Sequence, residues 1–227
     1  MSTAVGLPIC SAPGSFAIHR DAAYTKHLLT TPPTRYTEVP RVVLTTEAKD
    51  YDAKRVVAGF DRDLREEWTA YQVTRSQATK GIAAFVHKSV HVLDWGITLG
   101  AKPYIAGRRI KMLVRYPMWL HVRYHGQSYF LVGCHSPKTV FKPLQKPYLE
   151  HVHTLIAGHP NAVVAGDWNN DYQKVKHQLD LYWAFGDGII GIMGRKHTQQ
   201  GHRAVSKWGI QNKMADHPAI YTTVSPR

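Results

Sequence analysis

The sequence predicts an α/β protein built as a sandwich of two mixed β-sheets flanked by helices. Three observations predict this fold class. Short apolar or alternating runs, bounded by Gly, Pro or polar residues, recur from residue 71 onward and are typical of strands. Helical patterns lie between groups of these runs without strict alternation, which favours mixed or antiparallel sheets. A chain of 227 residues can bury a sizeable core, so we expect one domain over residues 1–227.

The first part of the chain has the weakest patterns. Residues 1–40 are punctuated by prolines and are poorly assigned, with one helix expected near residues 21–29. The run RVVLTTE at 41–47 predicts a buried strand that ends in a carboxylate, and the acidic segment 50–68 predicts a helix. The next strands are expected in YQVTR, GIAAFVHKS and HVLDWGITLG.

The second part has clearer patterns. Three strands are expected in RIKMLVRY, WLHVRYHG and SYFLVGCHS, and the last two form a hairpin that turns at residues 125–127. Residues 143–160 predict a helix, because apolar residues recur at helical spacing before Gly158 and Pro160 end it. NAVVAGDWNN predicts a short buried strand that runs into a polar loop, and DGIIGIMG and MADHPAIYTTV repeat this pattern around a basic stretch.

Positive charge is the most informative property of the composition. The chain has 29 Lys and Arg against 16 Asp and Glu, which gives a net charge of +13 and a pI of about 9.8. Residues 95–149 contain nine basic residues and no acid, and residues 188–213 are a second acid-free basic stretch. Such segments favour a polyphosphate partner, because phosphate neutralisation and counterion release drive binding. A solubilising surface, or a ribosome-associated or virion-packaged protein, would show the same charge.

Several classes of protein are disfavoured. No run approaches the roughly 20 apolar residues of a membrane helix, and the N-terminus lacks the pattern of a signal peptide. We therefore expect a soluble protein, cytoplasmic or phage-encoded, that has no membrane partner. The two cysteines, Cys10 and Cys134, are too few for a disulfide framework or a cysteine-based zinc site, so buried thiols are expected.

Candidate catalytic residues come from the few acids that remain in the basic part of the chain. Only seven acids follow Glu67, and three of them adjoin apolar runs: Asp167, Asp187 and Asp216. Loops at strand ends are held by a rigid scaffold, where sites tend to form. Each acid alone could be an ordinary turn residue. Their grouping with Asn169 and His217 indicates a site.

These residue types suit phosphodiester cleavage. Carboxylate and amide oxygens bind the hard divalent cation that neutralises developing charge. A His that is oriented by an Asp supplies a base near neutral pH, and Asn, His and Arg donate hydrogen bonds to phosphate oxygens. The pattern therefore indicates a metal-dependent phosphodiesterase with Asp167, Asn169, Asp216 and His217 at its centre.

An ordered set of motifs resembles the endonuclease/exonuclease/phosphatase superfamily, the DNase I-like proteins. GDWNN and ADHPAIYTTV are similar to the family's GDFN and SDHxPV motifs. RVVLTTEA resembles the strand that ends in a metal-binding Glu, and LVGCHSP resembles the strand that ends in the first catalytic His. DGIIGIMG resembles the Asp-headed strand whose acid supports the final His. The resemblance spans residues 41–224 and implies a four-layer α/β-sandwich.

Carried over to this sequence, the resemblance implies a role for each matching residue. The catalytic set is His135, Asp167, Asn169, Asp187 and His217. The metal ligands are Glu47 and Asp216, which would hold Mg²⁺ or Mn²⁺, with Ca²⁺ also compatible. The residues expected to contact nucleic acid are Arg115, Lys138 and Trp168, the last by stacking on a base.

The chain departs from the family at two positions near the metal. The first strand usually carries an Asn, but Cys10 or Ser11 is nearest here, and Thr46 stands where a Gln precedes the metal Glu. The leading hypothesis is a metal-dependent endonuclease or exonuclease that acts on DNA rather than RNA. Two alternatives stay open: a catalytically silent nucleic-acid-binding or structural protein, such as one of a phage particle, and a phosphatase that acts on a small polyphosphate such as an inositol phosphate.

Overall fold

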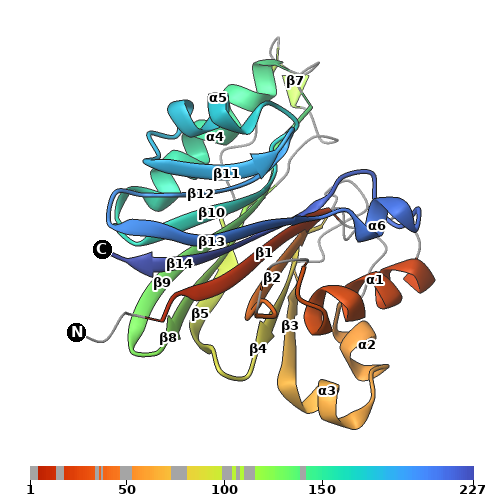
Figure 1. Ribbon diagram of the computed structural model, residues 1–227. Coiled ribbons are helices and arrows are strands. Elements are labelled where there is room, and N and C mark those ends of the chain that lie inside the picture. Colours follow the sequence, from red (N-terminus) through yellow and green to blue (C-terminus); the bar gives the residue numbers. More distant parts are fainter. Residues whose placement is uncertain are drawn as a thin grey trace.

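The computed structural model describes residues 5–13, 18–33, 36, 38–46, 53–72, 81–98, 104–105, 108–109, 116–138 and 142–227. Within these residues, two six-stranded mixed sheets stack face to face and helices cover their outer faces (Figure 1). The sandwich that the sequence predicts is therefore confirmed. None of the described helices combines the length and the apolar character needed to span a membrane.

The first sheet brings together strands that are far apart in the sequence. Its central strand, β1, runs parallel to β2 and antiparallel to β14, so the two ends of the chain pair with each other. In spatial order the strands are β13 (Thr198–Ser206), β14 (Ala219–Pro226), β1 (Leu7–Pro13), β2 (Val42–Thr46), β4 (Ala83–His87) and β3 (Trp68–Gln72).

The second sheet contains the predicted hairpin. His125 and Gly126 connect β8 to β9 with φ of 45° and 76°, as a two-residue turn of type I′ requires. Strand β10 is parallel to β9 and antiparallel to β12. In spatial order the strands are β11 (Trp183–Asp187), β12 (Ile190–Gly194), β10 (Ala162–Asp167), β9 (Gln127–His135), β8 (Met118–Tyr124) and β5 (His91–Ile97). A separate small ribbon consists of β6 (Tyr104–Ile105) and β7 (Arg108–Arg109).

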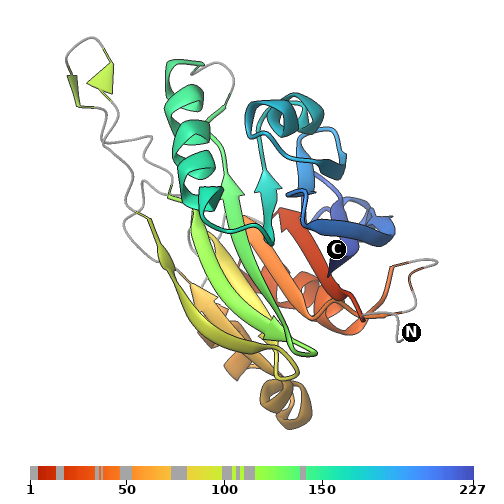
Figure 2. The same cartoon turned by 90° about the vertical axis from the view of Figure 1, so that its left-hand side faces the viewer.

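Helices complete the four layers (Figures 1 and 2). The outer face of the second sheet is covered by α4 (Lys142–Ala157) and α5 (Tyr172–Gln178), and the first sheet is covered by α1 (Ile18–Thr30), α2 (Ala53–Ala58), α3 (Arg62–Glu67) and α6 (Trp208–Gln211). Three apolar clusters result, one between the sheets and one beneath each helical layer. Both cysteines are free and buried, as expected.

The structure differs from the sequence prediction in several elements. The acidic segment forms two helices instead of one, because Asp61 caps α3 by accepting a hydrogen bond from the Leu64 amide at 3.1 Å. Strands β1, β11 and β13 were not predicted. The strand expected in RIKMLVRY lies mostly outside the described residues, since residues 110–115 are not among them.

Candidate active site

Polar side chains replace apolar ones where the strands of the second sheet end. Leu131 on β9 and Ala165 on β10 belong to the core between the sheets. Side chains alternate between the two faces of a strand, so His135 and Asp167 point into the same interlayer space at the last position of each strand. The side chains that line this space therefore change from apolar to ionisable at the carboxyl ends of β9 and β10.

His135 and Asp167 form a buried pair. They are opposite each other in the parallel register of β9 and β10, and they are only 1% and 5% exposed. The Nε2 atom of His135 lies 3.7 Å from Oδ2 of Asp167. This distance is too long for a strong hydrogen bond but gives a close electrostatic contact. An imidazole and a carboxylate are thus held together out of bulk water.

The GDWNN loop is closed by the Asp167 side chain. Its Oδ1 atom accepts the Asn169 amide hydrogen at 2.8 Å, an Asx turn, while its backbone carbonyl accepts from the Ser136 amide at 2.8 Å. Asn169 has a φ of 47°, a left-handed conformation that Asn tolerates, and its Nδ2 donates to the Ser136 carbonyl at 2.8 Å. A Cβ at Gly166 would overlap the carbonyl oxygen of Cys134, so the strand pairing requires glycine there.

A buried glutamine joins this loop to its neighbours. Gln145 on α4 donates from Nε2 to the Trp168 carbonyl at 3.3 Å and to the Ser136 hydroxyl at 3.4 Å. Its Oε1 accepts from Asn170 at 3.4 Å. Sequence reasoning missed Gln145, although a polar residue next to Leu144 on the buried face of the predicted helix was the available signal.

Trp168 does not have the predicted role. Its side chain is fully buried in the cluster beneath α4 and α5, and its indole Nε1 donates to the Gly191 carbonyl at 3.2 Å. The indole is therefore not available to stack on a base, which corrects the sequence prediction. Three residues after Trp168, Asp171 caps α5 by accepting hydrogen bonds from the amides of Gln173 and Lys174.

The first sheet adds two hydroxyls to the same interlayer space. Ser11 follows Ile9 by two residues and Thr46 follows Leu44 by two, and both of these apolar residues belong to the core between the sheets. The hydroxyls of Ser11 and Thr46 are buried and have no hydrogen-bond partner among the described residues. Buried polar atoms of this kind require an explanation such as a bound ion or water.

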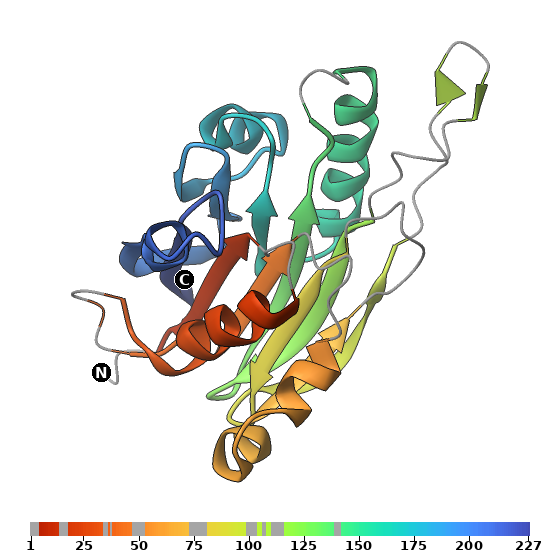
Figure 3. The same ribbon diagram turned by 90° about the vertical axis from the view of Figure 1, so that its right-hand side faces the viewer.

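The two sheets end at the same side of the sandwich. A Cβ built on Gly133 of β9 would lie 3.6 Å from Cδ2 of Leu44 on β2, which shows how closely the two strands approach. Figure 3 shows β1, β2, β9 and β10 pointing in the same direction. We call the side at which these strands end the carboxyl edge, and the other side the opposite edge.

Asp187 also lies at the carboxyl edge, but not where the sequence suggested. It ends β11 and does not head the following strand, because residues 183–187 form an unpredicted strand and a hairpin follows. Both Asp187 and Asp167 pair with Ile190 of β12. The two acids therefore lie at the same height in the sheet, on either side of β12, and their backbones are about 10 Å apart. The Asp187 side chain is exposed.

Asp216 and His217 lie just before β14, from which Pro218 separates them. Because Ser11 pairs with Ile220 in the antiparallel register of β1 and β14, the chain before Ala219 extends to the carboxyl edge. Asp216 is exposed and His217 is half-buried. The structure thus joins His135, Asp167 and Asn169 by direct contacts, and it brings Asp187, Asp216 and His217 to the same edge.

The remaining predicted residues cannot all be placed. Glu47 and Arg115 lie outside the described residues, and Lys138 is exposed just after the end of β9. Among the described residues, no group of three or more His, Cys, Asp or Glu side chains could hold a metal ion. The Asp167 carboxylate and the hydroxyls of Ser11 and Thr46, which have no partner among the described residues, are oxygen donors of the type that a hard cation binds.

Comparisons with known proteins show similarity at the level of structure. No protein-family model matches the chain, and no curated protein matches it. An endonuclease/exonuclease/phosphatase from Bacteroides vulgatus superposes with a TM-score of 0.70 at 11% identity, covering 97% of this chain and 99% of the other. D. rerio TDP2 complexed with a single-strand DNA product gives 0.64 at 17% identity, covering 96% and 98%. The human Nocturnin catalytic domain with bound sulfate gives 0.65 at 13% identity, covering 98% and 95%. The chain therefore has the DNase I-like fold of the endonuclease/exonuclease/phosphatase proteins that its motifs resemble.

Proposed function

We propose that this protein is a divalent-metal-dependent phosphodiesterase that cleaves nucleic acid, and DNA in preference to RNA. The observation that carries the proposal is the buried pair of His135 and Asp167, with Nε2 and Oδ2 3.7 Å apart, at the edge that also holds the loop before β14. Two further facts support it. The net charge of +13 suits a polyanionic substrate, and the similar structure of D. rerio TDP2 contains a single-strand DNA product.

A cation bound at this edge would neutralise the negative charge that develops on the phosphate. The residues of the chain supply the rest of the proposed chemistry. The Asp167 carboxylate positions the His135 imidazole, which donates a hydrogen bond to a phosphate oxygen. His217 is half-buried beside Asp216 and takes a proton from the attacking water, and Asp187 supports it. Asn169 holds the Asp167 loop against the end of β9 through Ser136.

Plasmid nicking tests the proposal. We expect purified protein to nick supercoiled DNA with Mg²⁺ or Mn²⁺, and EDTA to stop the reaction. Asp167→Asn and His217→Ala should each lower the rate of nicking by about 100-fold or more. Asp171→Asn is the matched control, because asparagine also caps a helix and the residue lies only four positions beyond Asp167. That variant should cut normally.

Two results would contradict the proposal. If the protein shifts DNA in a gel but does not cut it with either metal, it is a nucleic-acid-binding protein without this activity. If it releases inorganic phosphate from a soluble phosphate ester and leaves DNA intact, it is a phosphatase.

A further inference from the structure

A basic pocket lies at the opposite edge of the second sheet. Its volume is about 440 Å³, within the range of about 300–1,000 Å³ that is usual for ligand pockets. The residues that give it chemical character are Asp180, Tyr182, Arg195, Lys196 and His197. Three of them come from the second acid-free basic stretch of the sequence, which the candidate active site does not use.

The strand register separates this pocket from the catalytic candidates. The Tyr182 amide donates to the Gly194 carbonyl at 2.9 Å, and the Arg195 amide donates to the Ala162 carbonyl at 3.2 Å. The pocket therefore lies beside Ala162, the first residue of β10, whereas Asp167 is the last residue of that strand. Five residues of extended strand span about 17 Å, so a ligand of one nucleotide cannot occupy both places.

The pocket combines an exposed aromatic ring with several cations. The Tyr182 side chain is 52% exposed even though the Arg227 guanidinium carbon lies 4.5 Å from its ring centre. A hydrogen bond from Arg227, and the charges of Arg227, Lys196 and Lys176, lower the pKa of the Tyr182 phenol below its ordinary value. Positive charge around an open aromatic ring is the arrangement that single-stranded nucleic acids bind, through phosphate contacts and base stacking.

The frame of the pocket is fixed by hydrogen bonds. Arg195 is partly buried and donates from Nη1 to the Ile156 carbonyl at 3.1 Å. The Arg227 amide donates to the His197 carbonyl at 2.9 Å, which ties the end of β14 to the same loop. The backbone of the rim is thus held in place, and the Arg195 side chain is fixed before a ligand binds.

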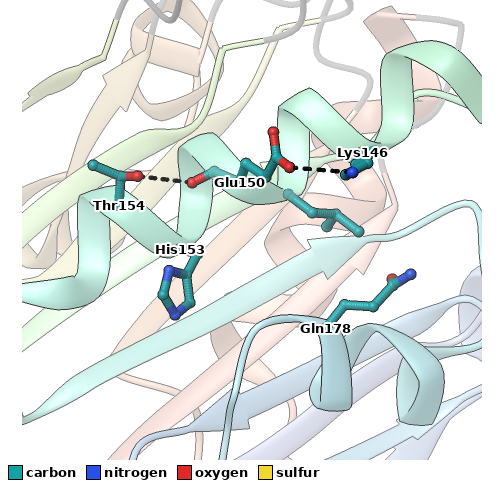
Figure 4. Close-up of a pocket in the computed structure, with 6 residues that line it drawn as sticks. Lys146, Glu150, His153, Thr154 and Gln178 are labelled. Carbon is teal, nitrogen blue, oxygen red and sulfur yellow. Dashed lines mark hydrogen bonds and ion pairs between the residues drawn. The ribbon is translucent and has the colours of Figure 1, made fainter.

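A second groove of similar size lacks this excess of positive charge. It lies between α4 and α5, has a volume of about 450 Å³ and also contains a lysine (Figure 4). There, Lys146 is paired with Glu150 at 3.8 Å, and the Thr154 hydroxyl donates to the Glu150 carbonyl at 2.9 Å. Its charge is balanced within the helix, so it gives no reason to expect an anionic ligand.

We propose that the basic pocket binds one nucleotide of a single-stranded nucleic acid, with the base stacked on Tyr182 and the phosphate held by Arg195 and Lys196. The proposal requires no chemical step and does not depend on cleavage at the carboxyl edge.

Fluorescence anisotropy with a short labelled oligodeoxythymidine in EDTA tests the proposal, because no cleavage occurs without metal. Tyr182→Ala should weaken binding about ten-fold, and Tyr182→Phe should retain most of the affinity because phenylalanine can stack. Lys196→Gln should also weaken binding and reduce the dependence on salt by about one counterion. Lys88→Gln changes an exposed lysine in the turn after β4 of the first sheet; it is the control and should bind as the unchanged protein does.

Cross-linking identifies the place of binding. An oligonucleotide with 5-bromouracil should cross-link on irradiation to the peptide that contains Tyr182, and the Tyr182→Ala variant should lose that product. Hydrolysis of bis(p-nitrophenyl) phosphate by Tyr182→Ala should be unchanged if the proposed phosphodiesterase activity is present. Two results would overturn the pocket assignment: equal affinity of Tyr182→Ala and the unchanged protein, or a Phe variant as weak as the Ala variant.

Discussion

The two edges of the sandwich both contain a histidine at a strand end, but the histidines differ in burial and in the charged groups beside them. At the carboxyl edge, His135 is buried beside the Asp167 carboxylate. At the opposite edge, the Nε2 atom of His87 at the end of β4 lies 3.2 Å from Nη1 of Arg41 and 4.0 Å from Oε2 of Glu67, and Tyr182 is half exposed to solvent. Strand ends deliver the first group to the interlayer space, whereas loops deliver Tyr182 and its cations to the surface. The comparison suggests that the carboxyl edge is suited to catalysis and the opposite edge to ligand binding.

The largest effect is expected when the carboxylate at the carboxyl edge is neutralised. Asp167→Asn keeps the oxygen that accepts the Asn169 amide but removes the negative charge beside His135. We expect nicking to fall by about 10²–10⁴-fold, the usual contribution of a positioned acid–base group, with DNA binding retained. Asp180→Asn is the matched variant at the opposite edge, where a φ of 50° suits asparagine equally well. Comparable losses of nicking in the two variants would remove the functional difference between the edges.

A pair of glycines compares the packing at the two edges. Gly166→Ala forces a Cβ into the Cys134 carbonyl, whereas an added Cβ at Gly158, just after α4, meets no atom within 4 Å. We expect Gly166→Ala to lower the free energy of unfolding by about 3 kcal/mol, the upper part of the range for overpacking. Gly158→Ala should change it by less than about 0.5 kcal/mol. Urea denaturation measures both, and similar midpoints would show that the carboxyl edge is not tightly packed.

The fold was predicted from strands whose patterns are local. The hairpin of β8 and β9, the helix at 142–157 and the strand before the GDWNN loop all show their own periodicity or turn residues. Strand β1 was missed because Pro8 and Pro13 suggested a loop, although its seven residues are all buried. Its partners β2 and β14 are distant in sequence, so no local pattern indicates that it is a central strand.

The candidate site was predicted in its motifs but not in its surroundings. GDWNN and HSP indicated Asp167 and His135, which the structure brings into contact. The roles of Gln145 and Ser11 depend on which face of a strand or helix meets another layer, and this follows only from tertiary packing. Trp168 was misjudged for the same reason, because its place inside a polar motif does not reveal that its indole turns into the core.

A smaller effect is expected for the glutamine that supports the active-site loop. Gln145→Ala removes the donor to the buried Trp168 carbonyl and the acceptor for the half-buried Asn170 side chain. We expect a loss of about 1–2 kcal/mol in the free energy of unfolding, with a fall in nicking that exceeds any change in DNA affinity. Gln178→Ala at the end of α5 is the matched control, because that side chain is exposed. Equal stability of the two variants would mean that Gln145 does not hold the loop.

The smallest effect is a dependence of stability on pH at the opposite edge. Burial, and then the positive charge of Arg41, lower the pKa of His87 below its ordinary value of 6.5, with Glu67 partly opposing them. The folded protein therefore keeps His87 neutral while the unfolded chain binds a proton, so this contribution to stability is present above pH 6.5 and is lost as the pH falls below it. Thermal unfolding between pH 7.5 and 5.0 should show a smaller loss of stability in His87→Gln than in the unchanged protein. His91→Gln, an exposed histidine at the start of β5, is the control and should keep the original dependence. Identical profiles for all three proteins would show that Arg41 and burial do not keep His87 neutral, and the electrostatic contrast between the two edges would then be lost.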